Sequence, residues 1–177
     1  YFDKRLKSRL AKISNLKKVD WTLVDVVFLS LPNGEAQKII KKLFHYKNLK
    51  FIDLSADFRI KDFKKYQNWY SINHNAKNLI NKSIYSIPEF TKEAIKKFRI
   101  IANPGCYPTS IHLALLPLLE KSLLNNTNIT IDSKSGYSGA GKNYKLKFNH
   151  KNFDSSIFVY GIEKHRHMSE LDQEFKK

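Results

Sequence analysis

The residue types with the clearest chemical potential lie at positions 103–108, where the sequence reads Asn-Pro-Gly-Cys-Tyr-Pro. Cys106 is the only cysteine of the chain and directly follows a Pro-Gly turn. The apolar stretch 111–119 predicts a buried helix, with Pro108 in its first turn. Because a helix N-terminus favours negative charge, a cysteine placed there suits a nucleophilic thiolate. The alternative is a small apolar side chain in a core, where most lone cysteines lie.

The elements that must position Cys106 follow the pattern of an α/β protein. Residues 25–31 and 50–55 are apolar runs that predict strands, and residues 35–46 between them have helical spacing. Residues 99–102 predict a further strand that ends just before the Cys106 turn. This order, with its short connections, predicts a partial Rossmann-type parallel sheet followed by the start of an α+β catalytic domain.

Ligands on such sheets bind beyond the carboxyl ends of the strands. Residues 30–34 and 55–59 are therefore expected to line a binding site. Residues 60–90 show little periodicity and predict an irregular excursion, and residues 91–98 predict a short helix that Thr91 caps.

Downstream of the Cys106 helix, the alternation in residues 128–133 predicts a strand, and residues 157–160 predict another. Residues 135–141 contain three glycines, which suggest close backbone approach to a ligand, although a flexible loop has the same composition. Residues 168–177 predict a helix.

The composition is that of a globular protein with a strong basic bias. The chain has 177 residues, 42% of them hydrophobic, and a formal net charge of +16. Only five of the 32 basic residues are arginine, whereas specific nucleic-acid readers rely on arginine. We therefore expect no specific nucleic-acid partner and interpret the charge as a general attraction for anionic metabolites.

Several classes of site and location are disfavoured. One cysteine rules out an intramolecular disulfide, and the scattered His74, His112 and His150 give little support for a metal site, so no metal is expected. No apolar run approaches the length of a membrane span. A cytoplasmic protein without a membrane partner is expected.

Both ends of the chain are expected to be incomplete. No GxGxxG turn precedes residues 25–31, and the sequence stops within a predicted helix. The phosphate loop of a dinucleotide site is therefore expected to precede Tyr1, and these 177 residues are expected to be inactive alone.

Six segments together resemble one enzyme family, the N-acetyl-γ-glutamyl-phosphate reductases, which are related to the aspartate-semialdehyde dehydrogenases. The most specific strings are Ala-Asn-Pro-Gly-Cys-Tyr-Pro-Thr at 102–109 and Asp-Leu-Ser-Ala-Asp-Phe-Arg at 53–59. The matching segments occur in the family's order and cover nearly the whole chain: 27–34, 51–59, 85–89, 102–109, 134–141 and 165–170.

The resemblance implies NADP(H)-dependent reduction of N-acetyl-L-glutamyl 5-phosphate to the 5-semialdehyde in arginine biosynthesis. Cys106 would attack the acyl phosphate to form a thioester. His165 or His167 would carry the proton, with His167 favoured, and Glu170 would orient an imidazole or bind the substrate. From the spacing alone, the two histidines could equally form an exposed basic cluster before a helix.

The resemblance also implies contacts with the cofactor and the substrate. The expected cofactor residues are Leu31, Pro32, Ser138, Gly139 and Ala140. The expected substrate residues are Ser55, Arg59 and Asn103, although a structural ion pair of Arg59 with Asp53 or Asp57 is an equal alternative. The chain departs from the family's pattern at Asn33, where histidine is common, and at Met168-Ser169, where Thr-Pro is usual.

The family's architecture divides the chain into two parts. Residues 1–104 would be the C-terminal part of a dinucleotide-binding domain, and residues 105–177 the N-terminal part of a catalytic domain. A homo-oligomer is expected for the full-length protein. Two other functions stay open: reduction of a carrier-linked aminoadipyl phosphate in lysine biosynthesis, and a basic RNA-binding module with a structural cysteine.

Overall fold

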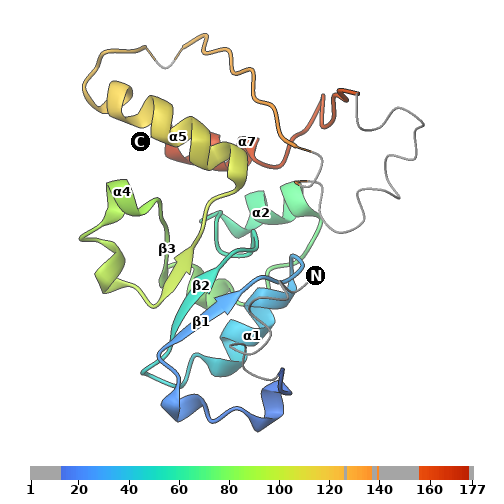
Figure 1. The fold of residues 1–177 in the computed structure, drawn as a ribbon, viewed down its shortest axis with the longest axis vertical. Helices are drawn as coiled ribbons and strands as arrows, with labels where there is room; N and C mark the ends of the chain where they lie inside the picture. Colours follow the sequence, from blue (N-terminus) through green and yellow to red (C-terminus); the bar gives the residue numbers. More distant parts are fainter. Residues whose placement is uncertain (1–12, 126, 137–138, 140–155, 176–177) are drawn as a thin grey trace, which may run out of the picture.

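The computed structural model describes residues 13–125, 127–136, 139 and 156–175. Four parallel strands form the sheet, in the order β1-β2-β4-β3. Their shared direction brings the four carboxyl ends to one edge, as Figure 1 shows, and the predicted α/β class is confirmed. The strands are β1 (Val26–Leu29), β2 (Lys50–Asp53), β3 (Ser83–Tyr85) and β4 (Ile100–Ala102).

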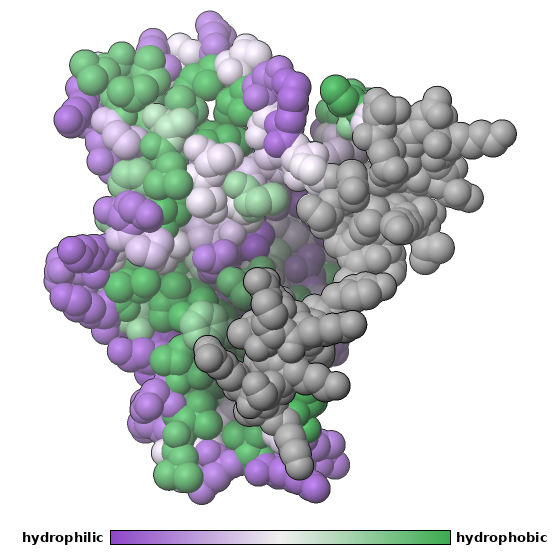
Figure 2. Space-filling model, in the orientation of Figure 1, coloured by the Kyte–Doolittle hydropathy of each residue, from purple (hydrophilic) through white to green (hydrophobic). Residues whose placement is uncertain are grey.

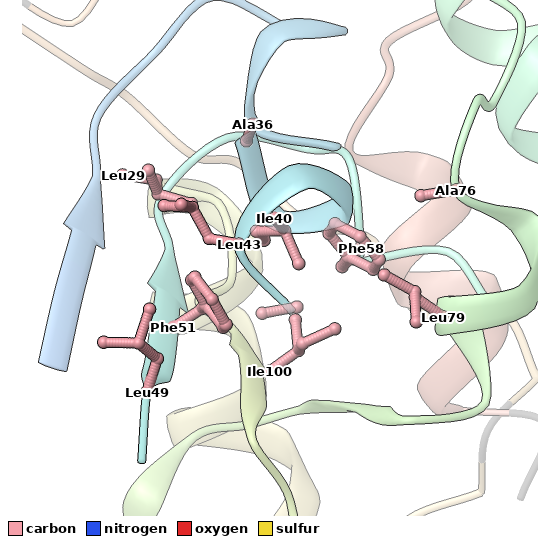
Figure 3. Packing of buried hydrophobic residues seen from close by; sticks show 11 residues of the cluster. Leu29, Ala36, Ile40, Leu43, Leu49, Phe51, Phe58, Ala76, Leu79 and Ile100 are labelled. Atoms are coloured by element: carbon pink, nitrogen blue, oxygen red, sulfur yellow. The ribbon is translucent and has the colours of Figure 1, made fainter. Parts of the chain in front are cut away.

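The main core lies between the sheet and the amphipathic helix α1 (Glu35–Leu43). Phe51 of β2 pairs in register with Ile100 of β4, and both side chains are fully buried. Ile40 of α1 packs onto them, as Figure 3 shows. Each such side chain contributes about 1.5–3 kcal/mol through its burial, so this layer holds the strand ends in place.

Residues 60–90 are not irregular, and that prediction is wrong. They form helix α2 (Phe63–Tyr70), helix α3 (Lys77–Ile80), strand β3 and helix α4 (Pro88–Thr91). Asp62 caps α2 by accepting from the amides of Lys64 and Lys65. The buried rings of Tyr66 and Tyr70, four residues apart, stack at 5.0 Å and give α2 its inner face.

Three other elements also differ from expectation. Thr91 is the last residue of α4 and does not cap a following helix. Its hydroxyl donates back to the Ile87 carbonyl, inside α4's own turn. Where the sequence predicted a helix at residues 91–98, only the 3₁₀ turn η4 (Ile95–Lys97) follows. Residues 128–133 and 157–160 are not strands among the described residues. A segment of alternating apolar and polar residues forms a strand only where a neighbouring strand pairs with its backbone. No strand of the described sheet pairs with either segment.

Helices α5 (Cys106–Glu120) and α7 (Met168–Glu174) contact each other beyond the carboxyl edge of the sheet, as Figure 1 shows. Both helices were predicted. Short 3₁₀ turns at η2 (Leu16–Lys18) and η3 (Trp21–Leu23) precede β1. Among the described helices, none is long and apolar enough to cross a bilayer.

Candidate active site

Cys106 is the first residue of α5, where the sequence predicted it, and its side chain is exposed. The turn before it is fixed at both ends. The Asn103 amide donates to the Asp53 carbonyl at 2.8 Å, and the Thr109 amide and hydroxyl both donate to the Gly105 carbonyl at 2.9 Å. The sulfur therefore lies on a rigid turn at the positive end of a 15-residue helix, open to solvent.

The imidazole of His167 packs directly on the residue that precedes the cysteine. A Cβ atom added to Gly105 would lie 2.4 Å from His167 Nε2, so only glycine permits this approach. Burial, then the charges of His165, Arg59 and Arg166, lower the pKa of His167 to about 4. The ring is therefore neutral at pH 7, and one of its nitrogens has a lone pair that can accept a proton.

His165 occupies the other side of the same turn. Its ring lies 5.6 Å from the Tyr107 ring and 4.9 Å from the His167 ring, centroid to centroid. Its Nδ1 accepts a hydrogen bond from the His167 amide at 3.3 Å. Burial and then the Arg166 charge lower the pKa of His165 as well. Both histidines thus flank the residues next to Cys106, and which of them moves the proton stays a prediction.

Tyr160 completes this aromatic group. Its hydroxyl donates to the Tyr107 hydroxyl at 3.1 Å, and its ring lies 5.3 Å from that of His165. Burial, the hydrogen bond to Tyr107 and the charges of Tyr107 and Cys106 raise the pKa of Tyr160 to about 12. Tyr160 is therefore close enough to Cys106 to respond to its charge, and it stays protonated at neutral pH.

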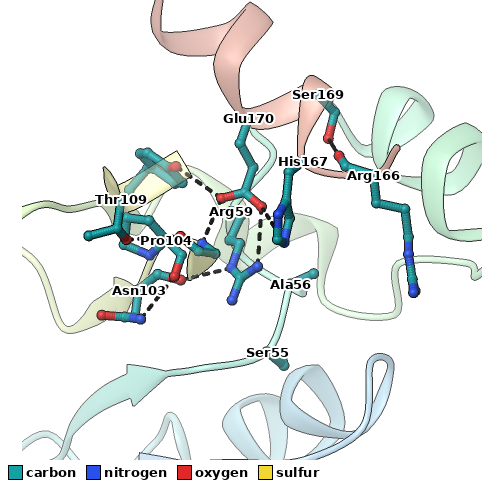
Figure 4. Close-up of polar contacts among 12 residues, drawn as sticks. Ser55, Ala56, Arg59, Asn103, Pro104, Thr109, Arg166, His167, Ser169 and Glu170 are labelled. Carbon is teal, nitrogen blue, oxygen red and sulfur yellow. Dashed lines mark hydrogen bonds and ion pairs between the residues drawn. The ribbon is translucent and has the colours of Figure 1, made fainter. Parts of the chain in front are cut away.

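Glu170 joins these parts from inside the protein. Its side chain is fully buried, and Figure 4 shows it projecting from α7 toward Arg59 beside His167. Oε2 accepts from the Gly105 amide at 3.0 Å and from the Tyr85 hydroxyl at 2.9 Å, and Oε1 pairs with Arg59 at 3.2 Å. Burial and then the Glu170 charge raise the pKa of Tyr85, so the phenol remains a donor.

Arg59, expected to contact substrate, makes all of its described hydrogen bonds within the protein. Its Nε donates to the Asn103 carbonyl at 2.7 Å, one terminal nitrogen to the Leu54 carbonyl at 2.9 Å and the other to Glu170. The ion pair that forms is with Glu170, which differs from the pairs with Asp53 or Asp57 that the sequence left open. This guanidinium connects three segments of the chain.

Ser55 and Asn103, the other expected substrate residues, lie at the same edge. The Ser55 hydroxyl is buried and accepts from the Asp57 amide at 3.2 Å. Asn103 is half-buried, and its side-chain amide donates to the Pro104 carbonyl at 3.0 Å. The structure thus joins Arg59 to Asn103, whereas the described bonds of Ser55 are with Asp53 and Asp57 in its own loop. Contact of these three residues with a substrate stays a prediction.

Asp57 has a structural role that the sequence analysis missed. Its carboxylate accepts from the Gly34 amide at 2.7 Å, the Gln37 amide at 3.0 Å and the Tyr66 hydroxyl at 2.7 Å. It therefore caps the N-terminus of α1 from the next loop. Asn33, which departs from the family's pattern, accepts from the Ala56 amide at 3.1 Å and joins the same two loops.

The residues expected to hold a cofactor are only partly described. Leu31 and Pro32 follow β1 and are exposed, and Leu54 is exposed after the neighbouring strand. These exposed apolar side chains follow neighbouring strands at the carboxyl edge of the sheet, where the sequence predicted a binding site. By contrast, the α1 N-terminus already binds the Asp57 carboxylate and offers no free amides of Gly34 and Gln37 to a phosphate.

In the glycine-rich loop, one of the three expected cofactor residues, Gly139, is described. The Gly139 amide donates to the Gly136 carbonyl at 3.0 Å. Ser138 and Ala140 lie outside the described residues. No group of three potential metal ligands occurs in the described part of the chain.

Two family models match the chain. Residues 3–98 match the semialdehyde dehydrogenase NAD binding domain, and residues 106–177 match the semialdehyde dehydrogenase dimerisation domain. The second match starts at Cys106.

Curated relatives are similar over most of the chain. A probable chloroplastic N-acetyl-gamma-glutamyl-phosphate reductase of Arabidopsis thaliana is 44% identical over 165 residues, which cover 93% of this chain and 41% of that protein. The N-acetyl-gamma-glutamyl-phosphate reductase of Desulforamulus reducens is 44% identical over 85% of this chain and 43% of its own length. That of Clostridium novyi is 41% identical over 92% and 48%. The chain spans less than half the length of these relatives.

Proposed function

Because this chain belongs to the semialdehyde dehydrogenase family, we propose that the protein reduces N-acetyl-L-glutamyl 5-phosphate to the 5-semialdehyde with NADPH, as part of arginine biosynthesis. One observation carries the proposal: an exposed cysteine begins α5, and a neutral histidine packs on the residue before it. This pair is what nucleophilic attack on an acyl phosphate requires.

In the first step, the Cys106 sulfur attacks the acyl carbon while the neutral imidazole of His167 accepts the thiol proton. The carbon–oxygen bond to phosphate breaks, and the imidazolium returns the proton to the departing phosphate. A thioester then joins the substrate to Cys106. The positive end of α5, which begins at Cys106, would stabilise the negative charge that develops on the carbonyl oxygen.

The exposed Leu31, Pro32 and Leu54 would contact the ring of NADPH, which would supply the hydride for the second step when bound. Reduction of the thioester leaves a thiohemiacetal oxyanion on Cys106. Its carbon–sulfur bond breaks to release the aldehyde, and a proton from solvent restores the thiol. One hydride and one proton are consumed in each turnover.

Arg166 supports recognition of an anionic substrate. It is exposed, its charge lowers the pKa of both His165 and His167, and its guanidinium lies over the Tyr70 ring, 5.7 Å from the ring centroid. Figure 4 shows it turned away from the buried Arg59–Glu170 pair. The phosphate of the substrate would contact Arg166, together with the predicted contacts to Ser55, Arg59 and Asn103.

Self-association through the part that matches the dimerisation domain is also proposed. Helix α5 is apolar nearly all round, and Leu113, Leu118 and Leu123 are exposed. Figure 2 shows hydrophobic surface at the end of the molecule where Figure 1 places this helix. A second copy covering these side chains would make a homo-oligomer, which sedimentation of the full-length protein tests.

The reaction is tested with Cys106→Ser in the full-length protein. The alcohol is too weak a nucleophile for this attack, so reductase turnover should be lost while NADPH binding persists. Ser110→Ala, on the exposed face of the same helix, is the matched control and should keep its activity. Turnover by Cys106→Ser would contradict the mechanism, and preference for an aminoadipyl phosphate would contradict the proposed substrate.

A further inference from the structure

Two tyrosine hydroxyls next to the cysteine have no part in the reaction steps described above. Tyr107 directly follows Cys106 in α5, and Tyr160 lies 53 residues later in the chain. The Tyr160 hydroxyl donates to the Tyr107 hydroxyl at 3.1 Å. Tyr107 is half-buried and Tyr160 is 55% exposed, so this hydroxyl pair lies at the protein surface, as Cys106 does.

The direction of this hydrogen bond leaves one proton of the pair available. A phenol hydroxyl can accept one hydrogen bond and donate another. The Tyr107 hydroxyl accepts from Tyr160, and its own proton has no acceptor among the described residues. Because a hydroxyl that accepts a hydrogen bond is polarised, it becomes a stronger donor. The Tyr107 hydroxyl can therefore donate to a bound molecule.

Ring contacts hold both tyrosines in place. The Tyr107 ring lies 5.6 Å from the His165 ring and 5.9 Å from the His167 ring, centroid to centroid. The Tyr160 ring lies 5.3 Å from that of His165, so this imidazole contacts both phenol rings. The packing restricts the rotation of both tyrosine side chains, and the hydroxyl pair is therefore preorganised beside the residues that flank Cys106.

The surroundings of the pair favour an anionic oxygen as the acceptor. Tyr160 stays protonated at neutral pH, because burial, the bond to Tyr107 and the charges of Tyr107 and Cys106 raise its pKa to about 12. The positive charge of Arg166 acts on His165, the imidazole that contacts both phenol rings. A hydrogen bond to an ionised acceptor is about twice as strong as one between neutral groups.

We propose that the Tyr107 hydroxyl, held and polarised by Tyr160, donates a hydrogen bond to the phosphate group of the substrate, so that the two tyrosines form part of a phosphate subsite beside Cys106. The inference rests on the proposed function and adds two residues to it. Tyr107 would touch a phosphate oxygen, and Tyr160 is a positioning residue that acts through Tyr107. Inorganic phosphate has the same oxygens and would occupy this subsite when the reaction runs in reverse.

The central test is Tyr107→Phe in the full-length protein, which keeps the ring and removes the hydroxyl. In the reverse reaction, KM for inorganic phosphate should rise about 10- to 100-fold, the loss expected for a hydrogen bond to a charged group, while KM for the aldehyde stays within about twofold. The matched control is Tyr46→Phe, which removes a hydroxyl from the loop before β2, at the opposite edge of the sheet. It should leave both KM values unchanged.

Tyr160→Phe tests whether Tyr160 acts through Tyr107. Alone, it should raise KM for inorganic phosphate about threefold, because the Tyr107 hydroxyl loses the donor that polarises it. In the Tyr107→Phe background it should have no further effect, whereas additive losses would mean that Tyr160 contacts phosphate by itself and would overturn its positioning role. Because Tyr160 is exposed, this variant also covers the case in which Tyr107→Phe does not fold.

Alkylation of Cys106 by iodoacetamide gives a readout that needs no turnover. Inorganic phosphate should slow the alkylation, and the concentration that halves its rate should rise about tenfold in Tyr107→Phe and stay unchanged in Tyr46→Phe. Equal protection of the unaltered protein and Tyr107→Phe would overturn the inference, and so would equal rises in KM for the aldehyde and for phosphate. If the unaltered full-length protein reduces no acyl phosphate, the proposed function fails, while the protection still decides whether the hydroxyl binds phosphate.

Discussion

The imidazole of His167 occupies the space that a side chain on Gly105 would need, since an added Cβ would lie 2.4 Å from Nε2. The glycine before the cysteine is therefore required by a side chain 62 positions later in the chain. The backbone of Gly105 has φ −67°, which any residue can adopt, so the requirement is one of space alone.

Gly105→Ala should displace the His167 ring by about 1 Å and lower kcat about 100-fold. It should also destabilise the protein, because the overlap is with a packed ring. Combining it with His167→Ala removes the overlap, so the stability loss of Gly105→Ala should largely disappear in the double variant. Thermal unfolding of the four proteins measures this coupling, and additive losses would count against the contact.

The pH profile of kcat/KM reports the free protein's proton acceptor. His167 has a pKa lowered to about 4, so it stays neutral, and activity should stay level, as the pH falls from 7 to about 5. The acidic limb should then have its midpoint near pH 4, with the exposed His45→Gln as an unaffected control. An acidic midpoint near 6.5 would show that another imidazole accepts the proton.

Asp53 should make folding stability depend on pH in the opposite sense to most carboxylates. Burial raises its pKa to about 6, above its ordinary 3.8, and its Oδ2 has no hydrogen-bond partner among the described residues. The folded state therefore holds the proton more tightly than the unfolded chain. Protonation of Asp53 therefore adds to the free energy of unfolding. This contribution is complete below about pH 4, is lost as the pH rises through 6, and is at most about 3 kcal/mol.

Asp53→Asn removes this titration. The unaltered protein should lose stability relative to Asp53→Asn between pH 4 and 7, measured as the difference in urea unfolding midpoints. Glu93→Gln, at an exposed pair with Lys96, is the control and should follow the unaltered protein. Parallel curves for Asp53→Asn and the unaltered protein would contradict the assignment.

Asp57→Ala should destabilise the fold by about 3 kcal/mol, because it leaves two amides at the start of α1 and a buried phenol without their acceptor. Tyr66→Phe removes one of the three donors and should destabilise by about 1 kcal/mol. For comparison, Asp62→Ala removes the exposed cap of α2 and should destabilise the fold by about 1 kcal/mol. Equal losses for Asp57→Ala and Asp62→Ala would show that Asp57 is only an ordinary cap.

Local signals in the sequence predicted the elements that carry strong apolar runs. β1, α1, β2 and β4 fall within their predicted ranges, and Cys106 begins the predicted helix. Helix α2 was missed because Tyr66 and Tyr70 are its only buried residues, among lysines, an asparagine and a glutamine. A spacing of four between two tyrosines after Asp62 was the available signal.

The contacts between site residues far apart in the chain could not be predicted from the sequence. Glu170 was a candidate by motif, yet its partners Arg59 and Tyr85 lie 111 and 85 residues earlier and meet it only in the folded chain. Asp57 likewise reaches back 23 residues to Gly34. Spacing predicts which residues share one helix or strand, whereas contacts between elements depend on how those elements dock.

The carboxylate that completes the cysteine's turn has a consequence for protein synthesis. Glu170 is translated 65 residues after Gly105, so a growing chain presents the thiol well before α7 can dock. Until the ribosome has released that later helix, the histidine is absent from the turn and the thiol lacks its proton acceptor. The nucleophile and its proposed proton acceptor therefore come together only when α7 docks, after both have been synthesised.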